Sequence, residues 1–79
     1  MEAYILLEAE SSKIWDVITA SLKIKGIKKT QAVAGQYDAV ALVNFKNMDD
    51  LGEVIEKIQK LKGVSRTQTL IAIPPKIYK

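Results

Sequence analysis

The chain has 79 residues, enough for one domain, and a domain of this size buries roughly 60% of the surface of its unfolded chain, which favours association. It contains no Cys and no His, which excludes disulfides, thiol and imidazole catalysis and the usual zinc ligands. Its 12 Lys and Arg residues against 9 Asp and Glu residues leave a net charge of +3, too weak a balance to indicate a nucleic-acid partner.

The first half of the chain is predicted to be strand, helix, strand. Residues 3–9 form a short, nearly continuous apolar run, typical of a strand that is covered on both faces. Ser11 or Ser12 can cap a helix that ends at Gly26, and residues 27–34 form a second, Lys-bearing strand suited to a sheet edge. The apolar positions of this helix share one stripe: Ile14, Val17, Ile18 and Leu22.

The second half repeats this order. Residues 37–45 are apolar at almost every position and predict a third strand, buried on both sides. Residues 49–50 begin a second helix, which Gly63 ends, and residues 64–73 predict a fourth strand before two prolines and a tail, 76–79. The apolar positions of this helix recur at spacings of three and four: Leu51, Val54, Ile55, Ile58 and Leu61.

The two halves are also related in sequence. Residues 23–33, KIKGIKKTQAV, match residues 60–70, KLKGVSRTQTL, at five of eleven positions and at a constant offset of 37 residues. In each copy a glycine separates an amphipathic segment from a strand-like run. The chain is therefore interpreted as two copies of one unit, joined at residues 35–38.

Two strand–helix–strand units predict an α+β, ferredoxin-like βαββαβ sandwich. Right-handed crossovers place the first and third strands at the centre of a four-stranded antiparallel sheet and both helices on one face. The central strands are apolar on both faces, so the uncovered face needs a partner. We expect a two-fold dimer that buries on the order of 1,200–2,000 Å² or more. Trp15 lies beside the apolar stripe of the first helix and either completes the core or anchors a neighbouring dimer.

The join at residues 35–38 is the most informative candidate site. Amides around Gly35 can bind a carboxylate, Asp38 can bind an ammonium group, and Tyr37 can form a wall with a hydroxyl. These groups complement a zwitterion. The alternative is an ordinary turn with an Asx hydrogen bond.

The fourth strand offers hydroxyls. Ser65, Thr67 and Thr69 share one face and either contribute to a small polar site or belong to an ordinary edge strand. Glu8 and Glu10 are interpreted as a solvated strand end rather than an acid/base pair, and no catalytic residue and no metal ligand is predicted.

Three motifs in this order resemble one known family. They are G-x-Y-D at residues 35–38, the stripe Leu51/Ile55/Ile58, and G-V-x-x-T-x-T at residues 63–69. Together they resemble the effector domain, known as the RAM domain, of the leucine-responsive and asparagine regulators, the Lrp/AsnC family.

The resemblance covers residues 4–73. It implies a ferredoxin-like fold, dimers that form an α/β barrel, rings of dimers, and amino acids bound without any cofactor in clefts between dimers. Carried over by position, the implied ligand contacts are Gly35, Tyr37, Asp38, Thr67 and Thr69.

The family's transcription factors carry a helix-turn-helix ahead of this domain. Here we expect residues 1–75 to be a single stand-alone domain with no DNA-binding domain, a cytoplasmic location and no membrane contact. The expected function is non-enzymatic amino-acid sensing in a homo-oligomer, with a full-length regulator as a further partner and without specific DNA binding. The alternatives are a cofactor-free enzyme of the small-monooxygenase type and a ligand-free structural adaptor. The Lys- and Ile-rich composition resembles that of thermophiles.

Overall fold

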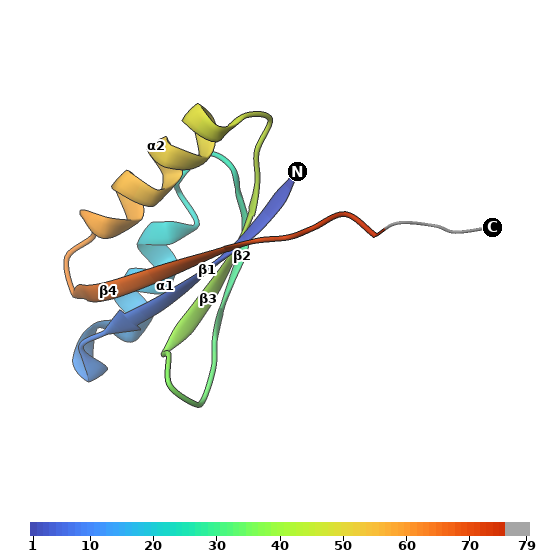
Figure 1. The fold of residues 1–79 in the computed structure, drawn as a ribbon. Coiled ribbons are helices and arrows are strands. Elements are labelled where there is room, and N and C mark those ends of the chain that lie inside the picture. The colour runs from blue at the N-terminus through green and yellow to red at the C-terminus, as the bar shows by residue number, and fades with distance from the viewer. Residues whose placement is uncertain (76–79) are drawn as a thin grey trace.

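The computed structural model describes residues 1–75 and contains the elements in the predicted order (Figure 1). The predicted tail, residues 76–79, lies outside the described residues. No helix in the described part is long and apolar enough to cross a membrane. The elements are β1 (Glu2–Ala9), a 3-10 helix (Ser11–Lys13), α1 (Ile14–Ser21), β2 (Ile27–Ala32), β3 (Ala39–Asn44), α2 (Met48–Gln59) and β4 (Val64–Ile71).

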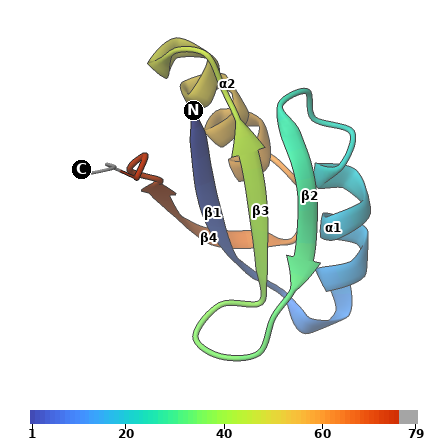
Figure 2. The same ribbon diagram turned by 90° about the vertical axis from the view of Figure 1, so that its right-hand side faces the viewer.

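The four strands form one antiparallel sheet in the order β2-β3-β1-β4, with both helices on one face (Figure 2). β1 and β3 pair directly at the centre, from Glu2 opposite Asn44 to Leu7 opposite Ala39. The prediction of a ferredoxin-like sandwich with β2 and β4 at the edges is therefore confirmed.

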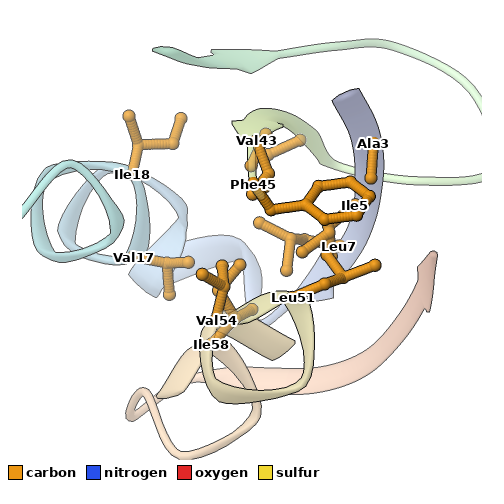
Figure 3. Close-up of a cluster of buried hydrophobic side chains, with 12 residues drawn as sticks. Ala3, Ile5, Leu7, Val17, Ile18, Val43, Phe45, Leu51, Val54 and Ile58 are labelled. Carbon is orange, nitrogen blue, oxygen red and sulfur yellow. The ribbon is translucent and has the colours of Figure 1, made fainter. Parts of the chain in front are cut away.

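The core lies between the sheet and the helices (Figure 3). Alternate residues of the central strands face the helices because strand side chains point to opposite faces in turn. These residues, Ile5 and Leu7 of β1 and Val43 of β3, are 0% exposed. They meet Val17 from α1 and apolar residues of α2, so one contiguous core holds both helices on the sheet.

The opposite face of the sheet is uncovered and apolar. Leu6, Val40 and Leu42 are partly buried there, while Tyr4 and Leu70 are 42% and 46% exposed. In the register Tyr4 lies opposite both Leu42 and Leu70, and Leu6 lies opposite Val40. Residues that lie opposite each other on paired strands point to the same face, so all five side chains point away from the helices. We call these five residues the open-face patch.

The first helix is shorter than predicted and begins differently. α1 ends at Ser21, five residues before Gly26, and neither Ser11 nor Ser12 caps it, because a 3-10 helix precedes it without a side-chain cap. The early end leaves Leu22 50% exposed. The buried stripe is instead completed by Ser21, which is 0% exposed.

Ser21 tolerates burial because its hydroxyl is fully bonded. Its Oγ donates to the carbonyl of Ile18 at 2.7 Å and lies 2.8 Å from Thr30 Oγ1 of β2. The pair of hydroxyls therefore joins α1 to the sheet edge.

We expect Ser21→Ala to lower the free energy of unfolding by roughly 1–3 kcal/mol, because it leaves the Thr30 hydroxyl without this partner. Urea unfolding followed by circular dichroism measures the change. Ser12→Ala is the control, since Ser12 is exposed and its loss should cost less than about 0.5 kcal/mol. Equal effects of the two substitutions would contradict the role given to Ser21.

The interpretation that Trp15 completes the core is wrong. The side chain is 69% exposed, because the face of α1 that packs on the sheet carries Val17, Ile18 and Ser21. Trp15 therefore projects from the outer side of the helix.

The second half departs from prediction at its boundaries. α2 begins at Met48 and is capped by Asn47, whose Oδ1 accepts a hydrogen bond from the amide of Asp50 at 2.9 Å. β3 starts at Ala39 rather than residue 37, and β4 ends at Ile71 rather than residue 73. The loop between β2 and β3 is therefore longer than the sequence indicated.

The internal repeat is visible in the backbone. Gly26 and Gly63, which match in the sequence alignment of the halves, have φ of 102° and 100° and stand directly before β2 and β4. This left-handed region favours glycine, so both copies use the same residue for the same turn.

Candidate functional site

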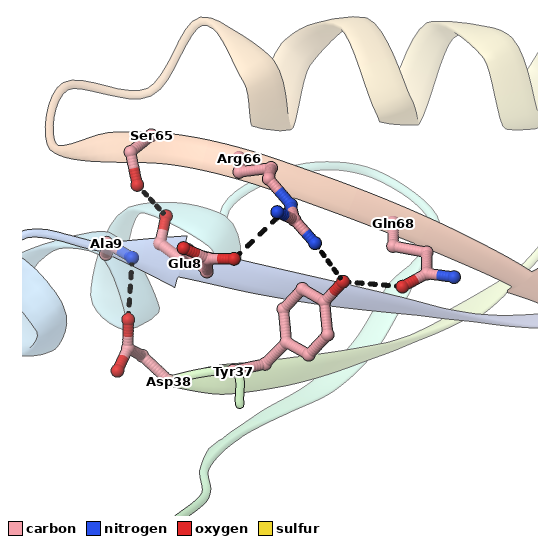
Figure 4. A network of polar contacts seen from close by, with 7 residues as sticks. All are labelled: Glu8, Ala9, Tyr37, Asp38, Ser65, Arg66 and Gln68. Atoms are coloured by element: carbon pink, nitrogen blue, oxygen red, sulfur yellow. Dashed lines mark hydrogen bonds and ion pairs between the residues drawn. The ribbon is translucent and has the colours of Figure 1, made fainter. Parts of the chain in front are cut away.

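The loop between β2 and β3, residues 33–38, is held at Asp38. The amide of Val33 donates to the Asp38 carbonyl at 2.9 Å, and the Asp38 amide donates to the Leu7 carbonyl at 2.8 Å. Asp38 Oδ2 also accepts a hydrogen bond from the amide of Ala9 at 2.9 Å (Figure 4). One residue therefore closes the loop, extends the β1–β3 pairing and bonds the end of β1.

The tip of the loop faces open space. Gly35 is exposed with φ of 137°, and a Cβ atom built on it would meet no atom within 4 Å. The glycine is therefore needed for its backbone conformation rather than for close packing. Residues 34–38 form a broader turn than the two residues that separate the predicted strands 27–34 and 37–45.

The side chain of Tyr37 leaves the loop and lies over the uncovered face of the sheet (Figure 4). Its hydroxyl donates to Oε1 of Gln68 at 2.5 Å and accepts from Nη2 of Arg66 at 3.0 Å. The guanidinium carbon of Arg66 also lies 5.6 Å from the centre of the tyrosine ring, within range of a cation–π contact. The loop is thereby attached to β4.

Arg66 connects this contact to β1. Its Nε lies 3.3 Å from Oε2 of Glu8, and Ser65 Oγ donates to the Glu8 carbonyl at 3.1 Å, where the β1–β4 register shifts. The hydrogen bond and charge of Tyr37, then the charge of Glu8, raise the pKa of Arg66 above its ordinary value. The guanidinium therefore stays charged at any working pH. Glu8, Tyr37, Arg66 and Gln68 are called the Arg66 network.

The two predicted threonines lie elsewhere in the same protomer. Thr67 pairs with Leu7 and Thr69 with Ile5, so both face the helices, whereas Tyr37 reaches the opposite face. Thr67 Oγ1 accepts a hydrogen bond from Nε2 of Gln59 on α2 at 3.3 Å. Within one protomer the structure brings Gly35, Tyr37 and Asp38 together in one loop, but it does not bring the threonines to Tyr37. Ligand contact by these five residues stays a prediction.

Arg66 and Gln68 were not predicted from the sequence as neighbours of the loop. The alternation of β4 was a usable signal, because Arg66 and Gln68 alternate with the two threonines and must therefore point to the other face. What the sequence did not reveal is that Tyr37 crosses to that face. Its orientation depends on a loop closed by contacts between distant residues.

A separate cleft of about 380 Å³ lies at the other end of the sheet, next to the beginning of β2 and the end of β3. Its lining includes Lys25, Asn44 and Val54 and none of the predicted ligand contacts. Within residues 1–75 no group of three or more Cys, His, Asp or Glu side chains is placed to hold a metal ion. The loop and the Arg66 network therefore remain the candidate site.

Comparison with known proteins gives a consistent match. The family model for the Lrp/AsnC ligand binding domain matches residues 2–78. Homocitrate synthase from Sulfurisphaera tokodaii is 34% identical over 74 residues, which are 92% of this chain. The chain spans 16% of the length of that enzyme, so the similarity concerns one segment of it.

Solved structures match over the whole fold. The protein TTHA0845 from Thermus thermophilus is 29% identical with a TM-score of 0.90, covering 98% of both chains. AsnC from E. coli is 25% identical with a TM-score of 0.79, covering 99% of this chain and 54% of AsnC.

Proposed function

We propose, from the premise that this chain belongs to the Lrp/AsnC ligand-binding domain family, that it is an amino-acid-sensing regulatory module with no catalysis of its own. The loop at residues 33–38 carries this proposal. It is fixed at Asp38, its glycine tip faces solvent, and Asp38 Oδ1 has no hydrogen-bond partner within residues 1–75. A fixed loop with an available carboxylate oxygen and free amides offers complements to both charged groups of an amino acid.

The proposed binding mode assigns each group of the ligand a partner. Backbone amides near Gly35 bind the α-carboxylate, Asp38 binds the ammonium group, and Tyr37 forms one wall. The loop tip is open on its outer side, and a second copy of the chain is proposed to complete the cleft there. Thr67 and Thr69 are proposed to come from that copy, because β4 is an edge strand.

The proposed assembly begins with a dimer formed through the open-face patch, which gives the α/β barrel. Dimers then meet at their loops to form rings, and the ligand lies between dimers. A ligand that binds one assembly state more tightly than another shifts the population towards it, and a coupling of roughly 1–3 kcal/mol is ordinary for such systems.

Two kinds of partner are proposed, each from one relative. AsnC supports a full-length regulator, since this chain matches 54% of it. The homocitrate synthase supports an enzyme as the regulated partner, since the matching segment is a small part of that protein. We propose no direct reading of DNA by residues 1–75, because both helices pack on the sheet. The filled core between sheet and helices gives no support to a cavity enzyme (Figure 3).

We expect Asp38→Asn to weaken amino-acid binding by roughly tenfold or more, because a charge-assisted hydrogen bond to the ligand ammonium is lost. Asparagine keeps an oxygen for the Ala9 amide, so the loop should stay closed. Titration calorimetry against each common amino acid measures the affinity. Asp49→Asn, an exposed change in α2, serves as the control and should bind as the unaltered protein does. Unchanged affinity in Asp38→Asn would remove Asp38 from the site.

A further inference from the structure

The Arg66 network lies directly beside the proposed amino-acid site. Tyr37 belongs to the loop, and its hydroxyl is 3.0 Å from Nη2 of Arg66. In the sheet register Arg66 is opposite Glu8, one step beyond the pair of Gln68 and Leu6, at the loop end of the uncovered face. The guanidinium is therefore at the border between the loop and the open-face patch, with 66% of its side chain exposed.

Arg66 has unused hydrogen-bond donors at this position. A guanidinium carries five N–H donors, and the contacts with Glu8 and Tyr37 involve Nε and Nη2. Within residues 1–75 Nη1 has no acceptor at hydrogen-bond distance, and neither has the Gln68 amide nitrogen. The Tyr37 hydroxyl, by contrast, already donates to Gln68 and accepts from Arg66. The groups still available on Arg66 and Gln68 are thus donors.

We propose, resting on the amino-acid-binding function above, that Arg66 binds the side chain of the ligand and that this side chain ends in a carboxylate or carboxamide oxygen. The main-chain groups of the ligand are already assigned to the loop amides and to Asp38. The side chain is the remaining part, and next to it lie Arg66 and Gln68, which offer N–H donors.

An aliphatic side chain is disfavoured at the same position. It would remove water from the charged pair of Arg66 and Glu8 and from Gln68 without replacing the lost hydrogen bonds. A terminal oxygen replaces them, and a carboxylate also forms a charge-assisted pair with the guanidinium. The ligand class is therefore the acidic amino acids and their amides.

The charge of Glu8 affects the acidic and the amide members of this class differently. Its carboxylate partly neutralises Arg66 and repels a second carboxylate nearby. A carboxamide is not repelled and can also donate to Glu8. Removing the charge of Glu8 therefore strengthens binding of an acidic ligand and does not strengthen binding of an amide ligand.

The test is titration calorimetry of the full chain with L-glutamate, L-glutamine and L-leucine. The unaltered protein should bind glutamate or glutamine at least about tenfold more tightly than leucine, and Arg66→Gln should remove most of that preference. Lys29→Gln is the matched control, because Lys29 is a cation of the same sheet face on the far edge strand β2. Thermal melting by circular dichroism verifies that each variant is folded.

Glu8→Gln gives a readout that a purely structural role of Arg66 would not produce. If the unaltered protein prefers glutamate, Glu8→Gln should bind glutamate more tightly than the unaltered protein does. If the unaltered protein prefers glutamine, Glu8→Gln should bind glutamine no more tightly. Leucine binding as tight as that of both polar ligands, or an unchanged preference in a folded Arg66→Gln variant, overturns the proposal while the amino-acid-binding function stands. If no common amino acid binds, the proposed function itself fails.

Discussion

Replacing Leu42 with aspartate is expected to convert the proposed dimer into monomers. Leu42 lies in the open-face patch at the centre of the uncovered face, between the central strand β1 and the edge strand β2. In a dimer formed through this face, an aspartate here would be a buried charge without a partner. The buried charge would weaken association of the dimer by roughly 3 kcal/mol or more, which corresponds to a loss of over a hundredfold in dimer affinity.

Leu22→Asp is the matched control for this experiment. Leu22 is 50% exposed on the end of α1, so the same chemical change is made on a different face. Light scattering or native mass spectrometry should give the mass of the unaltered assembly for Leu22→Asp and that of a monomer for Leu42→Asp. An unchanged mass for Leu42→Asp would show that the uncovered face is not the interface.

Gly63→Ala is expected to lower the free energy of unfolding by roughly 3 kcal/mol or more. Gly63 has φ of 100°, which an alanine adopts only with strain of about 1–3 kcal/mol. The added Cβ would also stand 2.7 Å from the Cβ of Lys13, an atom too close to its backbone to move away. Overpacking of this kind costs a further 1–3 kcal/mol or so. Urea unfolding followed by circular dichroism measures the change.

Alanine substitutions at two other glycines distinguish the steric cause of this loss of stability from the backbone strain. Gly26 has almost the same φ, but a Cβ there meets Val54 Cγ2 at 3.3 Å, a side-chain atom that can shift. Gly35 meets nothing and retains only the backbone term. The loss of stability should therefore decrease from Gly63→Ala to Gly26→Ala to Gly35→Ala. A larger loss for Gly35→Ala than for Gly63→Ala would contradict the steric explanation.

The sheet could be predicted because its signals are local and periodic. Ile5 and Leu7 alternate with Leu6, and Ala41 and Val43 alternate with Val40 and Leu42, so the sequence itself marks strands that are apolar on both sides. The repeat placed the glycines before β2 and β4, and φ near 100° at both confirms their equivalence. The family resemblance was confirmed by the match to residues 2–78.

The candidate site was harder to predict, because its geometry depends on contacts distant in sequence. A strand starting at Tyr37 would have pointed its ring towards the helices, on the face of Ala39. The structure begins β3 at Ala39 instead, since Asp38 closes the loop and bonds Ala9, 29 residues away. Tyr37 is thereby free to cross to Arg66. No local pattern contains that information.

The exposure of Trp15 turns the protein into its own optical probe. As the single tryptophan of the chain, 69% exposed on the outer side of α1, it emits as an indole in water. An assembly built only through the open-face patch leaves this emission unchanged, because the patch and α1 lie on opposite sides of the sheet. A partner that covers α1 shifts the emission to shorter wavelength. Fluorescence during titration therefore distinguishes association through the sheet from association through the helices, without any label.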